Sequence, residues 1–123
     1  MPGTKQTGDM GERIASQYLT SKGYTILERN WRSRHLELDI ICQIDEYLVF
    51  VEVKYRKNTK FGDPVEFITE QKMRHLSDAA ADYMEQSAYT GLIRFDIIGI
   101  RPGQADHYKI QHLEDIHFPG WDP

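Results

Sequence analysis

Two neighbouring segments in the first half of the chain, about residues 36–43 and 47–56, alternate apolar with polar side chains. A period of two is typical of β-strands that bury one face. The Asp45-Glu46 pair between them predicts a tight turn, so we expect the two segments to form an antiparallel hairpin. The side chains predicted to share its apolar face are Leu38, Ile40, Cys42 and Ile44 from the first strand, and Val49, Val51 and Val53 from the second.

Two other segments have the period of about 3.6 residues that is typical of amphipathic helices. The first is expected over about Met10–Lys22, with Asp9 as its N-cap and Gly23 at its end. The second is expected over about Thr69–Gln86. Its predicted buried face consists of Met73, Leu76, Ala80 and Tyr83.

Three further short segments have the composition of strands, at about Tyr24–Glu28, Leu92–Arg101 and His107–His112. Residues 29–32 are expected to form a turn region and residues 58–64 a loop. The element order is then αβββαββ, which predicts an α/β fold with a mixed β-sheet flanked by helices.

The length of 123 residues fits a single domain, expected to span residues 1–123 with a flexible N-terminus at 1–8 and a C-terminal tail at 113–123. One cysteine, Cys42, allows no intrachain disulfide. No stretch approaches about 18 consecutive apolar residues, so we expect no membrane partner. A cytoplasmic location follows by elimination, because the N-terminal residues also lack a signal-peptide pattern.

The formal net charge of -4 argues against a protein that coats nucleic acid non-specifically. The charge is unevenly placed: residues 1–75 hold 12 Lys/Arg and 11 Asp/Glu, whereas residues 76–123 hold 3 and 8. The basic residues either form solvated faces or bind phosphate groups. Two basic clusters stand out, Arg29, Arg32 and Arg34, and then Lys54, Arg56, Lys57 and Lys60.

The predicted hairpin register brings charged residues together. Pairing outward from the turn places Asp39 opposite Glu52 and Glu37 opposite Lys54, with facing Cβ atoms about 4.5–5.5 Å apart. Like charges opposite each other destabilise a sheet, whereas a divalent cation would turn the repulsion into binding. Carboxylates without histidine or cysteine favour Mg²⁺ or Mn²⁺. The pattern therefore suggests metal-dependent phosphodiester hydrolysis, with Lys54 placed for the phosphate or the attacking water.

A plainer interpretation of the same pattern stays open. Glu37 and Lys54 could form a simple cross-strand ion pair, with Asp39 and Glu52 solvated on an exposed face. Phe50, on the same face, favours a partly covered surface, where an unpaired acid is costly.

These residues also carry a family resemblance. The run Glu37-Leu38-Asp39-Ile40-Ile41 followed by Val49-Phe50-Val51-Glu52-Val53-Lys54 resembles the PD-(D/E)XK motif of the restriction-endonuclease-like superfamily. Most of the chain, about residues 8–100, is similar to the YraN-like family of small bacterial proteins. The supporting matches are Gly11-Glu12 with Ala15, Gly23-Tyr24, Asn30-Trp31-Arg32, Gly62-Asp63-Pro64, Lys72 and Arg94-Phe95-Asp96.

The resemblance implies a restriction-endonuclease-like fold, similar to that of archaeal Holliday-junction resolvases, and a DNA endonuclease acting on branched or structured DNA. By motif position Asp39 and Glu52 would be metal ligands, Lys54 the catalytic lysine and Glu12 a further acid. One departure is Leu36, where the family usually has glycine.

DNA is the expected partner, recognised by shape or without specificity. The residues expected to hold its backbone are Arg32, Arg34, Arg56, Lys57 and Lys72. The alternative function is a non-catalytic module that binds nucleic acid or a repair protein on the same fold. A homodimer is a further expectation from resolvase-like proteins, although the sequence shows no distinct dimer stripe.

Overall fold

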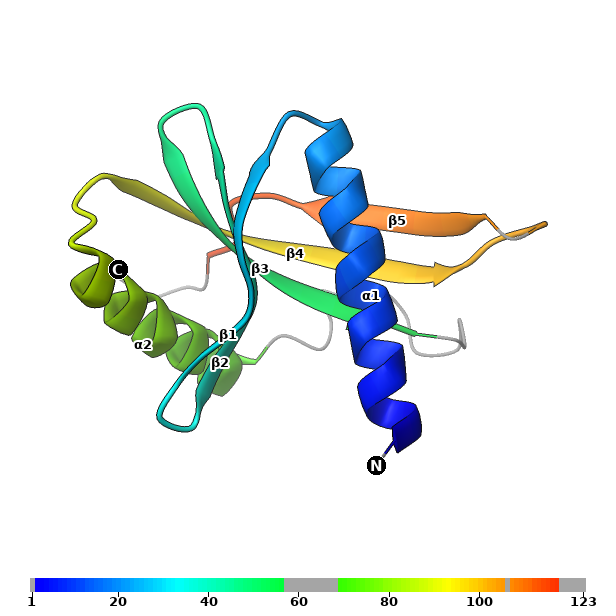
Figure 1. The fold of residues 1–123 in the computed structure, drawn as a ribbon, viewed down its shortest axis with the longest axis horizontal. Coiled ribbons are helices and arrows are strands. Elements are labelled where there is room, and N and C mark those ends of the chain that lie inside the picture. Colours follow the sequence, from blue (N-terminus) through cyan, green and yellow to red (C-terminus); the bar gives the residue numbers. More distant parts are fainter. Residues whose placement is uncertain (1, 57–68, 106, 118–123) are drawn as a thin grey trace.

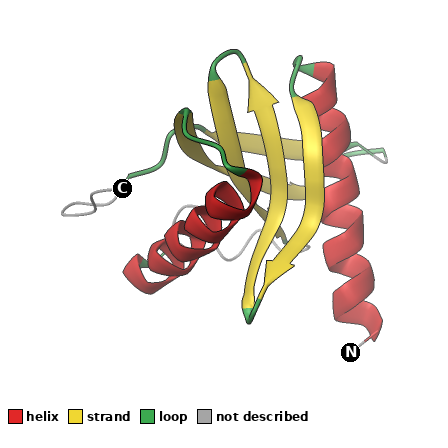
Figure 2. Cartoon of the chain, turned by 60° about the vertical axis from the view of Figure 1, so that its left-hand side comes forward, coloured by secondary structure: helices red, strands yellow, loops and turns green. Residues whose placement is uncertain are grey.

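The protein is a five-stranded mixed sheet with one helix on each face (Figures 1 and 2). The computed structural model describes residues 2–56, 69–105 and 107–117. The strand order is β1-β2-β3-β4-β5, and only β3 and β4 pair in parallel. The elements are α1 (Pro2–Ser21), β1 (Thr25–Ser33), β2 (Leu36–Ile44), β3 (Tyr47–Tyr55), α2 (Glu70–Ser87), β4 (Leu92–Pro102) and β5 (Tyr108–Leu113).

Helix α1 is longer than expected. It begins at Pro2, so the prediction that Asp9 caps the helix is wrong. The segment before Met10 has no apolar stripe, and periodicity therefore could not reveal that it is helical. The predicted end is confirmed, because Gly23 has φ 96° and the N–H of Tyr24 donates to the carbonyl of Leu19 at 3.0 Å.

Strand β1 runs through residues 29–32, and the prediction of a turn region there is wrong. Arg29 pairs with Ile40, and Trp31 pairs with Leu38. Two irregularities hide the strand from a periodicity argument: a register shift between Ile26 and Glu28, and a positive φ of 53° at Asn30.

The central hairpin keeps the predicted register near its turn, from Ile44 opposite Tyr47 to Ile40 opposite Val51. Beyond the Ile40–Val51 pair the backbone pairing of these two strands ends, and β2 separates from β3 (Figure 1). The predicted pairing of Glu37 with Lys54 is wrong, since Glu37 pairs instead with Arg32 of β1. The sheet therefore opens into a fork between β2 and β3.

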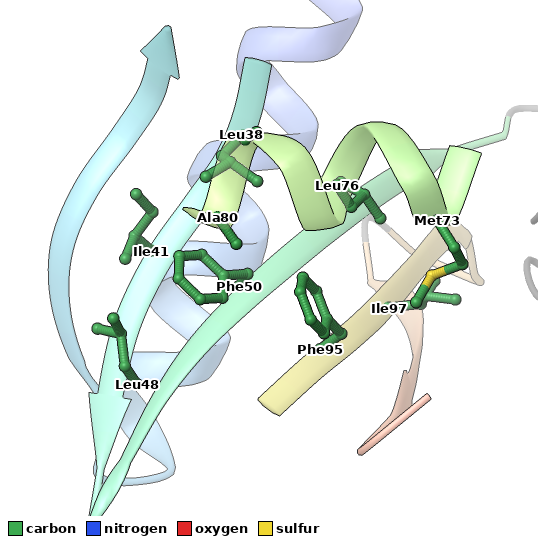
Figure 3. Close-up of a cluster of buried hydrophobic side chains, with 10 residues drawn as sticks. Leu38, Ile41, Leu48, Phe50, Met73, Leu76, Ala80, Phe95 and Ile97 are labelled. Carbon is green, nitrogen blue, oxygen red and sulfur yellow. The ribbon is translucent and has the colours of Figure 1, made fainter. Parts of the chain in front are cut away.

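The fork also changes which face Leu38 occupies. Leu38 packs with Ile41 and Phe50 under α2 (Figure 3), whereas Ile40 and Cys42 pack under α1. The prediction that Leu38 shares the face of Ile40 is therefore wrong. A period of two holds only while a strand stays regular, and β2 loses its partner β3 after Ile40.

Helix α2 covers the second face of the sheet. It begins at Glu70, where the Thr69 hydroxyl accepts the N–H of Lys72 at 3.1 Å. Met73, Leu76 and Ala80 are buried, which confirms three of the four residues predicted for the buried face of this helix. Tyr83 is half-buried, and its ring packs edge-on against Trp31 and Phe50.

A buried polar network stiffens the opposite face. Asp96 on β4 is 1% exposed and receives hydrogen bonds from the Arg94 guanidinium at 2.8 and 2.9 Å. Its Oδ2 lies 2.7 Å from Nε2 of His112, and its Oδ1 accepts the N–H of Asp115. Burial alone would raise the pKa of Asp96, but these hydrogen bonds lower it. The network is internally satisfied and joins β4 to β5 and the following segment.

The loop expected at 58–64, Lys57 and the last residues of the expected tail lie outside the described part of the chain. Leu113, where that tail was expected to begin, is the last residue of β5. Across the described ranges, neither helix has the length and apolar composition needed to span a bilayer.

Leu38 is fully buried under α2, so we expect its truncation to destabilise the protein strongly. Leu38→Ala should lower the free energy of unfolding by about 2–5 kcal/mol, because it leaves a cavity under α2. The same change at Leu92, which is 50% exposed, should alter it by about 0.5 kcal/mol or less. Urea denaturation followed by circular dichroism measures both values. Equal losses for the two variants would contradict the packing described here.

Candidate functional site

The candidate site lies where β2 and β3 separate. At this point the side chain of Asp39 reaches across the gap, and its Oδ2 accepts the N–H of Val53 at 2.8 Å. A carboxylate thus takes a backbone donor of β3 in the opened part of the sheet. This hydrogen bond fixes Asp39 at the point of divergence.

Glu52, one residue earlier on β3, is 5% exposed. Its Oε1 lies 3.3 Å from Nζ of Lys54 and 3.1 Å from Nζ of Lys72. Lys72 belongs to the first turn of α2, whose start is fixed by the Thr69 cap. The two ammonium groups compensate the buried carboxylate, which would otherwise be costly.

Helix α1 brings a third acid to the fork. Glu12 is 6% exposed, although it is a charged residue on a helix. Its neighbour Gly11 allows the close approach, since a Cβ at Gly11 would lie only 3.2 Å from the Cβ of Tyr55 on β3. A small residue at this contact therefore places the Glu12 carboxyl inside the site.

Glu12, Glu37 and Asp39 form an acidic cluster in which one carboxylate oxygen of each lies within 4.8 Å of the others. Oε2 of Glu12 is buried and has no hydrogen-bond partner among the residues that the structure describes. Buried polar atoms are nearly always hydrogen-bonded, so this oxygen is available to a ligand.

Burial changes the titration of two acids of the cluster, Asp39 and Glu12. Burial, together with repulsion from Glu52, raises the pKa of Asp39 to about 8, against the lowering effect of the Val53 hydrogen bond. Burial also raises the pKa of Glu12, although hydrogen bonding to Asn30 opposes it. A bound cation would reverse both effects.

These residues fit a hard divalent cation. Carboxylate oxygens are the side-chain ligands that Mg²⁺ prefers, and the cluster offers three of them together with one unpartnered oxygen. Glu52 is not one of these three acids, and its Oε1 contacts the two lysines. It nevertheless lies close enough to Asp39 to raise the pKa of that carboxyl.

The fork brings together four predicted site residues, Glu12, Asp39, Glu52 and Lys54. It also includes Glu37, which the register argument had assigned only to a partnership with Lys54. Its position two residues before Asp39 was the available signal, but the pairing with Lys54 concealed it.

The predicted DNA-binding residues are more dispersed. Arg32 lies 3.8 Å from Glu37, and Lys72 belongs to the Glu52 contact. The backbone N–H of Arg56 donates to the carbonyl of Ile100. Arg34 lines an open cavity of about 390 Å³ beside α2, together with His35, Leu36, His75, Asp78, Ala81 and Asp82.

Comparisons with known proteins agree on one family. The profile of the uncharacterised protein family UPF0102 matches residues 11–100. A UPF0102 protein of Syntrophomonas wolfei is 44% identical over 110 residues, covering 89% of this chain and 95% of the relative. UPF0102 proteins of Rhodococcus opacus and Phocaeicola vulgatus are 39% and 38% identical and cover 88% and 91% of this chain and 92% of each relative. The chain therefore belongs to the uncharacterised protein family UPF0102.

Proposed function

We propose that this protein is a nuclease that uses Mg²⁺ or Mn²⁺ to hydrolyse phosphodiester bonds in DNA. The observation that carries the proposal is the geometry of the fork. Asp39 is held between two diverging strands, next to a buried Glu52 that contacts Lys54 and Lys72. The PD-(D/E)XK resemblance supports the same assignment and extends it to a restriction-endonuclease-like fold.

The acids of the fork would hold the metal. Asp39 and Glu52 occupy the ligand positions of the motif, and Glu12 and Glu37 add oxygens that lie within 4.8 Å of Asp39. When bound, the ion would polarise the phosphodiester and lower the pKa of a water molecule. A bound ion would also account for the grouping of acids with raised pKa values, because their mutual repulsion destabilises the sheet when no cation is present.

The lysines would act on the phosphate. The Lys54 ammonium is 3.3 Å from Oε1 of Glu52, so its charge is held within the fork. A positive group in this place stabilises the negative charge that develops on a phosphate during attack. Lys72, on α2, supports Glu52 and supplies a second positive charge for the strand.

Leu36 favours a second candidate, a nucleic-acid-binding module without turnover. Its side chain packs against the cluster under α2, at a position where the related family usually has glycine. A side chain there would restrict how closely a substrate backbone can approach. Binding of DNA without cleavage would identify this function.

Cleavage of DNA tests the proposal. The purified protein should cut linear, single-stranded or four-way-junction DNA with Mg²⁺ or Mn²⁺, and chelator should stop it. Asp39→Ala and Lys54→Ala should each lower the cleavage rate at least about 100-fold, because each removes a charge from the reaction centre. Gel assays under single-turnover conditions measure the rates.

The matched control for the lysine is Lys22→Ala at the exposed end of α1, and that for the acid is Asp45→Asn in the β2–β3 turn. Both controls should cut like the parent protein. Cleavage that survives in Asp39→Ala and Lys54→Ala would place the activity elsewhere, and absence of cleavage on all three substrates would remove the nuclease proposal.

Metal uptake should follow the protonation of Asp39. Metal binding requires deprotonated ligands, and the pKa of Asp39 is about 8 without metal. Titration calorimetry with MnCl₂ should therefore show tighter binding at pH 8 than at pH 6, with proton release at pH 6. Glu37→Gln should weaken binding and Asp39→Asn should abolish it, whereas Asp45→Asn should leave it unchanged. Uptake that Asp39→Asn does not reduce would exclude this site.

The raised pKa of Asp39 also predicts how stability depends on pH without metal. An unfolded Asp has a pKa of about 3.9, so between this value and about 8 the folded protein binds a proton that the unfolded chain does not. The stability that this group contributes is therefore lost as the pH rises from about 4 to 8. In chelator, Asp39→Asn should raise the thermal midpoint more at pH 8 than at pH 5. Parallel pH profiles for the parent and the variant would disprove the shift.

A further inference from the structure

Two basic residues face each other on the last two strands. Arg101 on β4 and Lys109 on β5 are direct partners in the antiparallel register. Like charges in this arrangement destabilise a sheet. Within the described ranges neither side chain has a carboxylate within 4.0 Å, so no acid of those ranges compensates the pair by an ion pair.

The setting makes this pair unusual. Residues 76–123 contain eight acids and only three basic residues. One of the three, Arg94, is bound to the buried Asp96. The other two are Arg101 and Lys109, which lie opposite each other rather than beside any of the acids that the structure describes. A surface selected only for stability would place an acid against at least one of them.

The register places the pair on the face that carries the candidate site. Glu52 pairs with Ile97, which is buried under α2, and the Lys54 row includes Gly99 and Gln111. Side chains alternate along a strand, and Ile100 and Ile110 of the intervening row belong to the cluster under α1. Arg101 and Lys109 therefore return to the face of Glu52 and Lys54.

The two places are far enough apart to contact different phosphates of one strand. Two residues along a β-strand correspond to about 7 Å, and β4 and β5 lie one and two strand spacings of about 4.8 Å to the side of β3, so the backbones of Arg101 and Lys109 lie about 8 and 12 Å from that of Lys54. Lys109 is exposed and Arg101 is half-buried, so neither side chain is closed off from solvent. A guanidinium group can bind phosphate through paired hydrogen bonds, and an ammonium group adds a point charge.

We propose that Arg101 and Lys109 form a phosphate subsite for the DNA strand that enters the fork. This inference rests on the proposed nuclease function and extends it by stating where the substrate backbone runs: along the face of β3, β4 and β5 beyond Lys54. An anion between the two basic groups converts their repulsion into binding. The subsite contacts only backbone, so it adds affinity without sequence preference.

Binding in chelator tests the subsite separately from cleavage. The intact protein is titrated onto a fluorescein-labelled DNA duplex at several salt concentrations, and the variants are Arg101→Gln and Lys109→Gln. Each should weaken binding and reduce the slope of log affinity against log salt by about 0.9, the value for one lost phosphate contact on duplex DNA. Lys109→Arg, which keeps the charge, should retain the parent slope.

The matched control is Lys22→Gln, which changes the net charge by the same amount at an exposed lysine in the turn after α1. It should leave affinity and slope unchanged. Thermal melting of each variant confirms that it is folded.

The results separate the two proposals. If Lys109→Gln and Arg101→Gln bind like the parent, or if Lys22→Gln weakens binding equally, the subsite is wrong even when the protein cuts DNA. If the two variants lose affinity but the parent never cuts with metal, the subsite stands and the nuclease function fails. A parent that binds no DNA at any salt concentration overturns the subsite.

Discussion

The hydrogen bond from the Val53 N–H to the Asp39 carboxylate marks the place on which the rest of this structure depends. A regular hairpin would pair β2 with β3 along their whole length. Here the recorded ladder ends at Ile40 and Val51, and a side chain takes the backbone donor beyond it. The opened sheet provides space into which residues from α1 and α2 can project, and without this opening the acids would lie on a flat surface.

The site is costly for the folded state, and the surrounding structure limits that cost. Glu52 is buried but contacts two lysines, whereas Asp39 and Glu12 are left with raised pKa values. Asp96, on the other side of the sheet, is buried more deeply but is hydrogen-bonded through both carboxylate oxygens, and its pKa is lowered. The contrast separates an acid that is satisfied within the fold from acids whose charged form the proposed cation would stabilise.

The proposed functions share one face of the sheet. Helix α2 covers part of that face and contributes Lys72, and the continuation of β4 and β5 beyond it carries Arg101 and Lys109. The acidic cluster would then bind a metal with the scissile phosphate, and the basic pair another phosphate of the same strand. Such local contacts are compatible with a net charge of -4, because a few positive side chains at the binding face can act while the rest of the surface is acidic.

Local patterns were sufficient to predict a mixed α/β sheet, the end of α1 at Gly23 and the turn register of the central hairpin, since periodicity and turn chemistry act over a few residues. They failed at β1, where a register shift and a positive φ at Asn30 interrupt the period, and at Leu38, where β2 is no longer paired with β3. The identities of the acids were visible in the chain, but their grouping was not. Glu12 and Glu37 meet Asp39 because the strands diverge and α1 packs closely at Gly11, and such long-range packing leaves no periodic signal in a single sequence.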